Sequence, residues 1–302
     1  MKTDLNVFCV YKVQLNKMAN NILSANKIDV NNVSFVVGQA KSGRNPPITM
    51  KYSGQNFQLR LPSKMLFPGG VLVREDEQTK NKSYTLIGSL KGCDPYGRER
   101  STDGSDDGAL YNLLVALEEH IQQQAFENSV KWFGKKRSLE AIRDSFKKII
   151  SVSSDKVGGE YIPNGKYPPS FRVKVPVYDG SVKSDIIDNV GNPIYSTPES
   201  LVSIFPKGIT ANLIMSGSIY VIAGGGFGVT WRLTYAQVFP YSKVTAADVF
   251  KSEELDEDRD EEEETTQPEA PVVQEEPVVV ATPAPEQPQV QAQPKKRRAA
   301  VN

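Results

Sequence analysis

Arginine and lysine side chains recur at alternate positions in three segments whose composition is typical of β-strands. Successive side chains of a strand point to opposite faces, so apolar residues flanking a cation predict one buried face and one basic face. A basic face that spans several strands suits a polyanionic partner. The cations are Arg60 in Phe57–Leu61, Arg172 and Lys174 in Phe171–Val177, and Arg232 in Val229–Phe239.

Tyrosines stand beside cations elsewhere in the chain. Lys51 precedes Tyr52, close to a basic loop at 41–47, and Tyr96 lies near Arg98. Binding to single-stranded nucleic acid without sequence preference uses cations along the phosphates and aromatic rings against the bases. We therefore take Lys51 and Tyr52, together with the four strand cations, as candidate contacts to nucleic acid.

Groups suited to catalysis or metal binding are few. His120 is the single histidine, and Cys9 and Cys93 are the two cysteines, which argues against the common zinc sites and against a histidine-activated nucleophile. The acidic turn at 103–108 has Leu114 where a calcium loop would need glutamate. No apolar run approaches the ~18 residues of a membrane-spanning helix. We predict no metal, no cofactor, no membrane contact and no enzymatic activity.

A glycine-rich hairpin is the element expected to position Arg232. Ser218–Ala223 and Val229–Phe239 have the composition of strands, and Gly224, Gly225 and Gly226 permit the backbone angles of a tight reversal. The second strand continues directly after the glycines, so no helix start is available for a dinucleotide phosphate. Alternation predicts a core face of Val229, Trp231, Leu233, Tyr235 and Phe239, and an outward face of Thr230, Arg232, Thr234, Ala236 and Val238.

The same hairpin carries a family resemblance. Gly226-Phe-Gly-Val-Thr-Trp-Arg-Leu233, followed by Gln237-Val238, resembles the C-terminal hairpin of a single-stranded DNA-binding protein family of nucleocytoplasmic large DNA viruses. The match is most specific over residues 208–240 and does not cover the C-terminal tail. It implies a core of the oligonucleotide-binding (OB) type, a β-barrel, with single-stranded DNA as the ligand.

The remaining patterns agree with a mainly β chain that has an α-helical insertion at about 107–151. Apolar spacing predicts one helix that ends at Gly134 and a second over 138–150, with Asp106 or Asp107 as the first cap. Strands are expected at 33–37, 48–52, 57–61, 71–74, 83–90, 171–177 and 185–188, with the 48–52 and 57–61 strands paired. A helical turn is expected at 62–67. The simplest fold is an OB-type barrel over residues 1–252.

Charge divides the chain in two. Of the 36 basic and 36 acidic residues, 5 and 14 lie in residues 253–302, which leaves residues 1–252 at +9 and the tail at −9. The tail is rich in Pro, Gln, Glu and Val, a composition expected to be disordered, and it ends in the basic cluster Lys295–Arg298.

Two functions fit these features. The first is sequence-nonspecific single-stranded DNA binding in viral DNA replication, repair or recombination, with the acidic tail as a contact for replication or repair proteins. The alternative is a virion structural or genome-packaging protein that uses the same basic surface. The expected location is the host cell, in a cytoplasmic virus factory or in the nucleus, or the virion itself. The sequence leaves the oligomeric state open.

Overall fold

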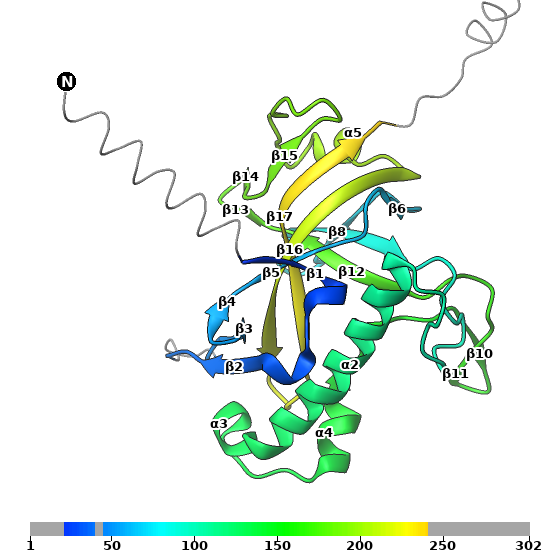
Figure 1. Ribbon diagram of the computed structural model, residues 1–302. Coiled ribbons are helices and arrows are strands. Elements are labelled where there is room, and N and C mark those ends of the chain that lie inside the picture. The colour runs from blue at the N-terminus through cyan, green and yellow to red at the C-terminus, as the bar shows by residue number, and fades with distance from the viewer. Residues whose placement is uncertain (1–20, 40–44, 241–302) are drawn as a thin grey trace, which may run out of the picture. The chain divides into compact units, whose positions relative to one another are not determined.

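A long β-hairpin forms the spine of the structure, a computed structural model that describes residues 21–39 and 45–240. Its strands are β16 (Ile209–Val221) and β17 (Phe227–Phe239), which pair antiparallel along their whole length (Figure 1). Gly224 and Gly225 have φ angles of 89° and 90°, so the predicted glycine reversal is confirmed. The expected tail and the N-terminal residues lie outside the described residues.

Each strand of the hairpin pairs with three short segments along its outer edge. The partners of β16 are antiparallel: β6 (Met65–Phe67), β5 (Gln58–Arg60) and β3 (Ile48–Tyr52). The partners of β17 are parallel: β9 (Phe146–Lys147), β12 (Ser170–Val175) and β15 (Asp185–Ile187). Among the described strands, the β16–β17 pairing is therefore the one that joins the two sides of the sheet.

Further strands extend the sheet on both sides. Beyond β12 come β8 (Lys82–Ser89) and β7 (Val71–Glu75), whereas β1 (Ile22–Ser24) pairs with β5. Near β3 lie β2 (Val33–Val37) and β4 (Gln55–Asn56). Two separate ribbons are β10 (Ser154–Val157) with β11 (Glu160–Pro163), and β13 (Val177–Tyr178) with β14 (Ser181–Val182). The described fold is mainly β, as predicted, and its strand order is open.

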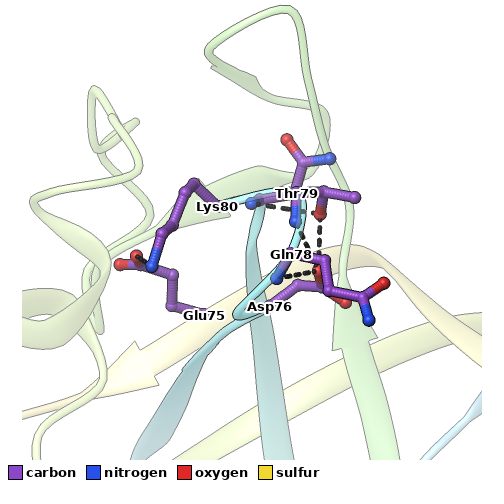
Figure 2. Close-up of polar contacts among 6 residues, drawn as sticks. Glu75, Asp76, Gln78, Thr79 and Lys80 are labelled. Carbon is purple, nitrogen blue, oxygen red and sulfur yellow. Dashed lines mark hydrogen bonds and ion pairs between the residues drawn. The ribbon is translucent and has the colours of Figure 1, made fainter.

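The turn between β7 and β8 is held by one carboxylate (Figure 2). Asp76 accepts hydrogen bonds from the N–H groups of Thr79 and Gln78 and from the Thr79 hydroxyl, and these bonds lower the pKa of its carboxyl. Glu75, the last residue of β7, lies 3.8 Å from the Lys80 ammonium. Glu75 and Asp76 are therefore both engaged locally.

The described residues form the helices α2 (Asp106–Glu127), α3 (Ser129–Phe133), α4 (Leu139–Ser145) and α5 (Leu201–Ile204), with short 3-10 turns at Ala25–Lys27 (η1) and Val30–Asn32 (η2). The apolar stripe of α2 is buried and Gly134 is the stop, at φ 73°, as expected. The single helix predicted up to Gly134 is instead divided at Asn128 into α2 and α3. The cap of α2 is Ser105, whose hydroxyl accepts from the Gly108 N–H, so the predicted aspartate cap is wrong. Asp106 and Asp107 instead lie in the first turn, where negative charge is favourable.

Three other expectations are corrected by long-range pairing. Residues 62–67 contain strand β6 rather than a helical turn, because Met65–Phe67 pairs with β16. Strand β3 pairs with β4 across the turn, whereas β5 pairs with β1 and β16. The second helix ends at Ser145, because Phe146 is buried in strand β9 beside β17.

A β-bulge reverses the burial pattern within β17. Leu233 pairs with Met215 and Tyr235 with Ile214, so Thr234 is an extra residue with no partner. Trp231 and Leu233 are buried as predicted, but beyond the bulge Ala236 and Val238 are buried while Tyr235 and Phe239 are half-buried. The predicted faces are therefore correct up to Leu233 and reversed after Thr234.

Candidate nucleic-acid interface

A groove of about 590 Å³ crosses the outer face of β17, β12, β8 and β7. Six cations line it, together with two tyrosines and several hydroxyl groups, and no aspartate or glutamate is among its lining residues. We call this site the basic groove. Its cations are Arg74, Lys147, Lys148, Arg172, Lys174 and Arg232, and its tyrosines are Tyr178 and Tyr220.

Strand register explains why cations from distant segments meet here. Lys174 of β12 is the partner of Arg232 on one side and of Thr85 on the other, and directly paired residues present their side chains on the same face. Arg172, two residues before Lys174, shares that face and is exposed like it. Val173 and Val175 alternate with them and are buried. The predicted outward face of this strand is confirmed.

Arg232 is oriented by a neighbouring strand. Its guanidinium donates a hydrogen bond to the Ser218 hydroxyl of β16, and the side chain is half-buried. The adjacent Trp231 points the other way and is only 3 % exposed. Tyr220, on the same strand as Ser218, is half-buried, and burial raises the pKa of its phenol, which keeps the hydroxyl protonated. The groove floor thus offers a fixed cation and an aromatic side chain.

Lys147 and Lys148, which the sequence predicted to be helical, form a wall of the groove. The backbone N–H groups of Ile149 and Ile150 donate to the half-buried carboxyl of Glu118 on α2, which holds this segment in extended form. Burial raises the pKa of Glu118, although the two N–H donors act in the opposite direction. Arg74 also lay in a predicted strand without being singled out. A run of β-branched residues after Lys148 was the available signal for an extended segment.

The six groove cations make no ion pair within the described residues. The two ion pairs found there join Lys80 to Glu75 and Arg100 to Glu119, all outside the groove lining. Unpaired cations on one surface leave their charge available to a ligand. The groove cations can therefore meet phosphates without first breaking an ion pair among the described residues.

The other predicted contacts do not reach the basic groove. Lys51 lies on β3, away from the lining residues, and the Tyr52 hydroxyl donates to the Lys27 carbonyl at 3.3 Å, a structural role. Arg60 lines a different cavity. Lys41 and Arg44 of the basic loop lie outside the described residues.

The cavity at Arg60 has a different chemical character and is here called the neutral pocket. It has a volume of about 550 Å³ and is lined by two cations, Lys27 and Arg60, and two acids, Asp106 and Asp185. Register places Arg60 opposite Ile214, which is opposite Tyr235. The pocket therefore lies on the same hairpin as the basic groove, at the end nearer the start of β16.

Within residues 21–39 and 45–240, no three His, Cys, Asp or Glu side chains are placed to hold a metal ion. Desolvation raises the pKa of the buried Cys93 thiol to about 11, which keeps it protonated at neutral pH. His120 Nε2 lies 2.8 Å from the Val33 carbonyl oxygen, a contact between a helix and a strand. Among the helices described, none is long and apolar enough to cross a membrane.

No protein-family model and no curated protein matches the chain. Among solved structures, it is similar to gp2.5, a single-stranded DNA-binding protein encoded by bacteriophage T7, with 12% identity and a TM-score of 0.35 over 70% of this chain and 100% of that one. A TM-score this low carries no argument about fold or function. The basic groove itself has to support any functional conclusion.

Proposed function

We propose that this chain is a sequence-nonspecific single-stranded DNA-binding protein that holds the phosphate backbone in the basic groove. The observation that carries the proposal is the gathering of six cations from four separate parts of the chain, with no acid among the lining residues. A polyanion is the ligand class that such a surface fits. Tyr178 and Tyr220 supply aromatic rings at the same site.

The shape of the sheet supports a single strand as ligand. Strand β6 pairs with β16 and strand β7 with β8, and only residues 68–70 separate them. One bent segment thus contacts both ends of the ladder β16–β17–β12–β8, as in a partly closed barrel of the OB type. Partly open barrels of that kind bind oligonucleotides across their strands. We extend the proposal to an OB-like core and to the viral family that the hairpin resembles.

The biological setting follows from this proposal. Single-strand binding serves DNA replication, repair or recombination, here in a virus-infected cell, in a cytoplasmic factory or the nucleus. The acidic tail is the segment proposed to contact replication or repair proteins. The proposal includes no catalytic activity.

A binding assay with the full-length chain tests the proposal. We expect tighter binding to a single-stranded oligonucleotide than to a duplex of the same length, with little dependence on sequence. Affinity should fall with salt by about 0.7 in log K per log salt unit for each phosphate neutralised. Equal affinity for duplex would instead favour the packaging alternative. Absence of binding at low salt would overturn both.

A further inference from the structure

A small lobe beside the basic groove exposes several large side chains. Tyr161 is 73% exposed, Tyr167 60%, Val157 57% and Ile162 50%, and all four belong to the β10–β11 ribbon or the residues directly after it. Soluble proteins rarely leave such a cluster uncovered without a ligand for it. Figure 1 shows β10 and β11 side by side, away from the central hairpin.

The two faces of the ribbon differ in charge. Lys156 pairs with Tyr161 and Ser154 with Pro163, so these residues share one face, which has no acid. Asp155 pairs with Ile162 and Val157 with Glu160, so both acids lie on the other face. The Lys156 ammonium lies 5.9 Å from the centre of the Tyr161 ring. The first face therefore combines an exposed aromatic ring with a cation.

The residues after the ribbon repeat this combination. The Lys166 ammonium lies 5.4 Å from the centre of the Tyr167 ring. The Tyr167 N–H donates to the Ser153 hydroxyl at 3.1 Å, and the Lys166 N–H donates to the Asn164 side-chain oxygen at 3.0 Å. These bonds order the backbone that carries Tyr167 before any ligand arrives.

A third tyrosine completes the lobe. Gly165 has φ 66°, and a Cβ there would lie 2.6 Å from the Tyr96 ring, so the ring packs directly on this backbone. The Arg98 guanidinium lies 5.4 Å from the centre of the Tyr96 ring. Tyr96 is 44% exposed. Three aromatic rings, each with its own cation, thus occur within one lobe.

The lobe is continuous with the basic groove. Ser151, which lines the groove, exchanges two backbone hydrogen bonds of 2.8 and 2.9 Å with Ser170, the first residue of β12. Arg172 follows two residues along β12, and Ser154 begins the ribbon three residues after Ser151. A single DNA strand that left the groove along this edge would meet the aromatic lobe next.

From this arrangement we infer that Tyr161 and Tyr167, supported by Tyr96, form a base-stacking surface for the single strand whose phosphates occupy the basic groove. The inference rests on the proposed function. Stacking on aromatic rings is tolerant of sequence, because every base has a flat face, and the adjacent cations would meet the phosphates between bases.

The test combines protein variants with oligonucleotides that lack bases. In the full-length chain, Tyr161→Leu and Tyr167→Leu should each weaken binding to single-stranded DNA about five-fold or more, with an unchanged salt slope. On an abasic oligonucleotide the same variants should bind as the parent does. Ile162→Ala, on the acidic face, and Tyr195→Leu, in the loop after β15, are the matched controls and should bind normally.

The outcomes distinguish failure of the stacking surface from failure of the proposed single-stranded DNA binding. Normal DNA binding by both tyrosine variants would overturn the stacking surface and leave the lobe to a protein partner. An equal loss on normal and abasic oligonucleotides would also overturn it. If the parent protein binds no single strand at all, the proposed function fails first.

Discussion

The two cavities on the β16–β17 hairpin have similar volumes, about 590 and 550 Å³, yet they differ in net charge. The basic groove collects six cations and no acid, whereas the neutral pocket has two of each. Both lie along the same pair of strands, so backbone geometry does not distinguish them. The difference comes from the neighbouring strands: β12 contributes Arg172 and Lys174, but β15 contributes Asp185.

This difference shows that a lone cation on an outward strand face is weak evidence for a phosphate site. Arg60 satisfied the same alternation rule as Arg172, but the cavity that it lines also contains Asp185 and Asp106, whose charges offset those of Arg60 and Lys27. The net charge of all residues that line a cavity is better evidence for a phosphate site. Predicting that charge from the sequence requires the strand order.

The largest effect is expected from the core beneath the groove. Trp231→Ala should reduce the free energy of unfolding by about 3–5 kcal/mol, because it removes a large buried side chain. Arg232→Ala, the next residue, should leave stability nearly unchanged and weaken DNA binding. Denaturant melts and binding isotherms on both variants decide the matter. Loss of DNA binding by a fully stable Trp231→Ala protein would reverse the face assignment.

The next effect compares DNA binding by variants of the two cavities. Replacing Arg172, Lys174 and Arg232 together by alanine removes three phosphate contacts. It should reduce the magnitude of the slope of log K against log salt for DNA binding by about 2, and the affinity for DNA about 50-fold near 0.15 M salt. Arg60→Ala should change affinity less than about two-fold. Salt titrations of DNA binding measure both. A larger loss from Arg60→Ala than from the triple variant would place the ligand in the neutral pocket.

A smaller effect is expected where Glu118 supports the groove wall. Glu118→Ala leaves two backbone N–H groups without an acceptor, at a cost of about 1–3 kcal/mol, whereas Glu118→Gln retains an oxygen acceptor. Because burial raises the pKa of Glu118 in the folded state above 4.5, the parent should lose stability relative to Glu118→Gln as pH rises through that pKa. Urea melts from pH 4 to 7 measure this trend. A parallel pH dependence in both proteins would contradict it.

The smallest effect concerns the acidic tail. Its negative charge should compete with DNA for the basic groove. Truncation after Ser252 should tighten DNA binding several-fold at low salt, because a tethered segment has an effective concentration of order millimolar. The gain should shrink with salt, since exposed charges are screened beyond about 8 Å at physiological ionic strength. Fluorescence anisotropy on both chains provides the comparison. Equal low-salt affinities would leave the tail a solubilising or partner-binding role.

Local patterns predicted the strands that make short-range pairs and the cations that alternate within them. Arg172 and Lys174 could be assigned because Phe171, Val173 and Val175 alternate with them without interruption. Lys147 and Lys148 could not, because their extended form depends on pairing of Phe146 with β17, about 80 residues away along the chain. The reversal after Thr234 depends equally on its partner strand, since an unpaired extra residue leaves no mark in composition.

The central hairpin also sets an order for assembly during synthesis. Strands β5, β6, β9 and β15 emerge from the ribosome before residues 209–239, yet they pair with β16 or β17. Ladders that contain neither strand of the hairpin, such as β7–β8, β2–β3 and β8–β12, can form earlier. A chain dominated by such distant pairings is expected to fold slowly and to expose unpaired strand edges meanwhile. A nascent chain stalled before Ile209 is therefore expected to depend on chaperones.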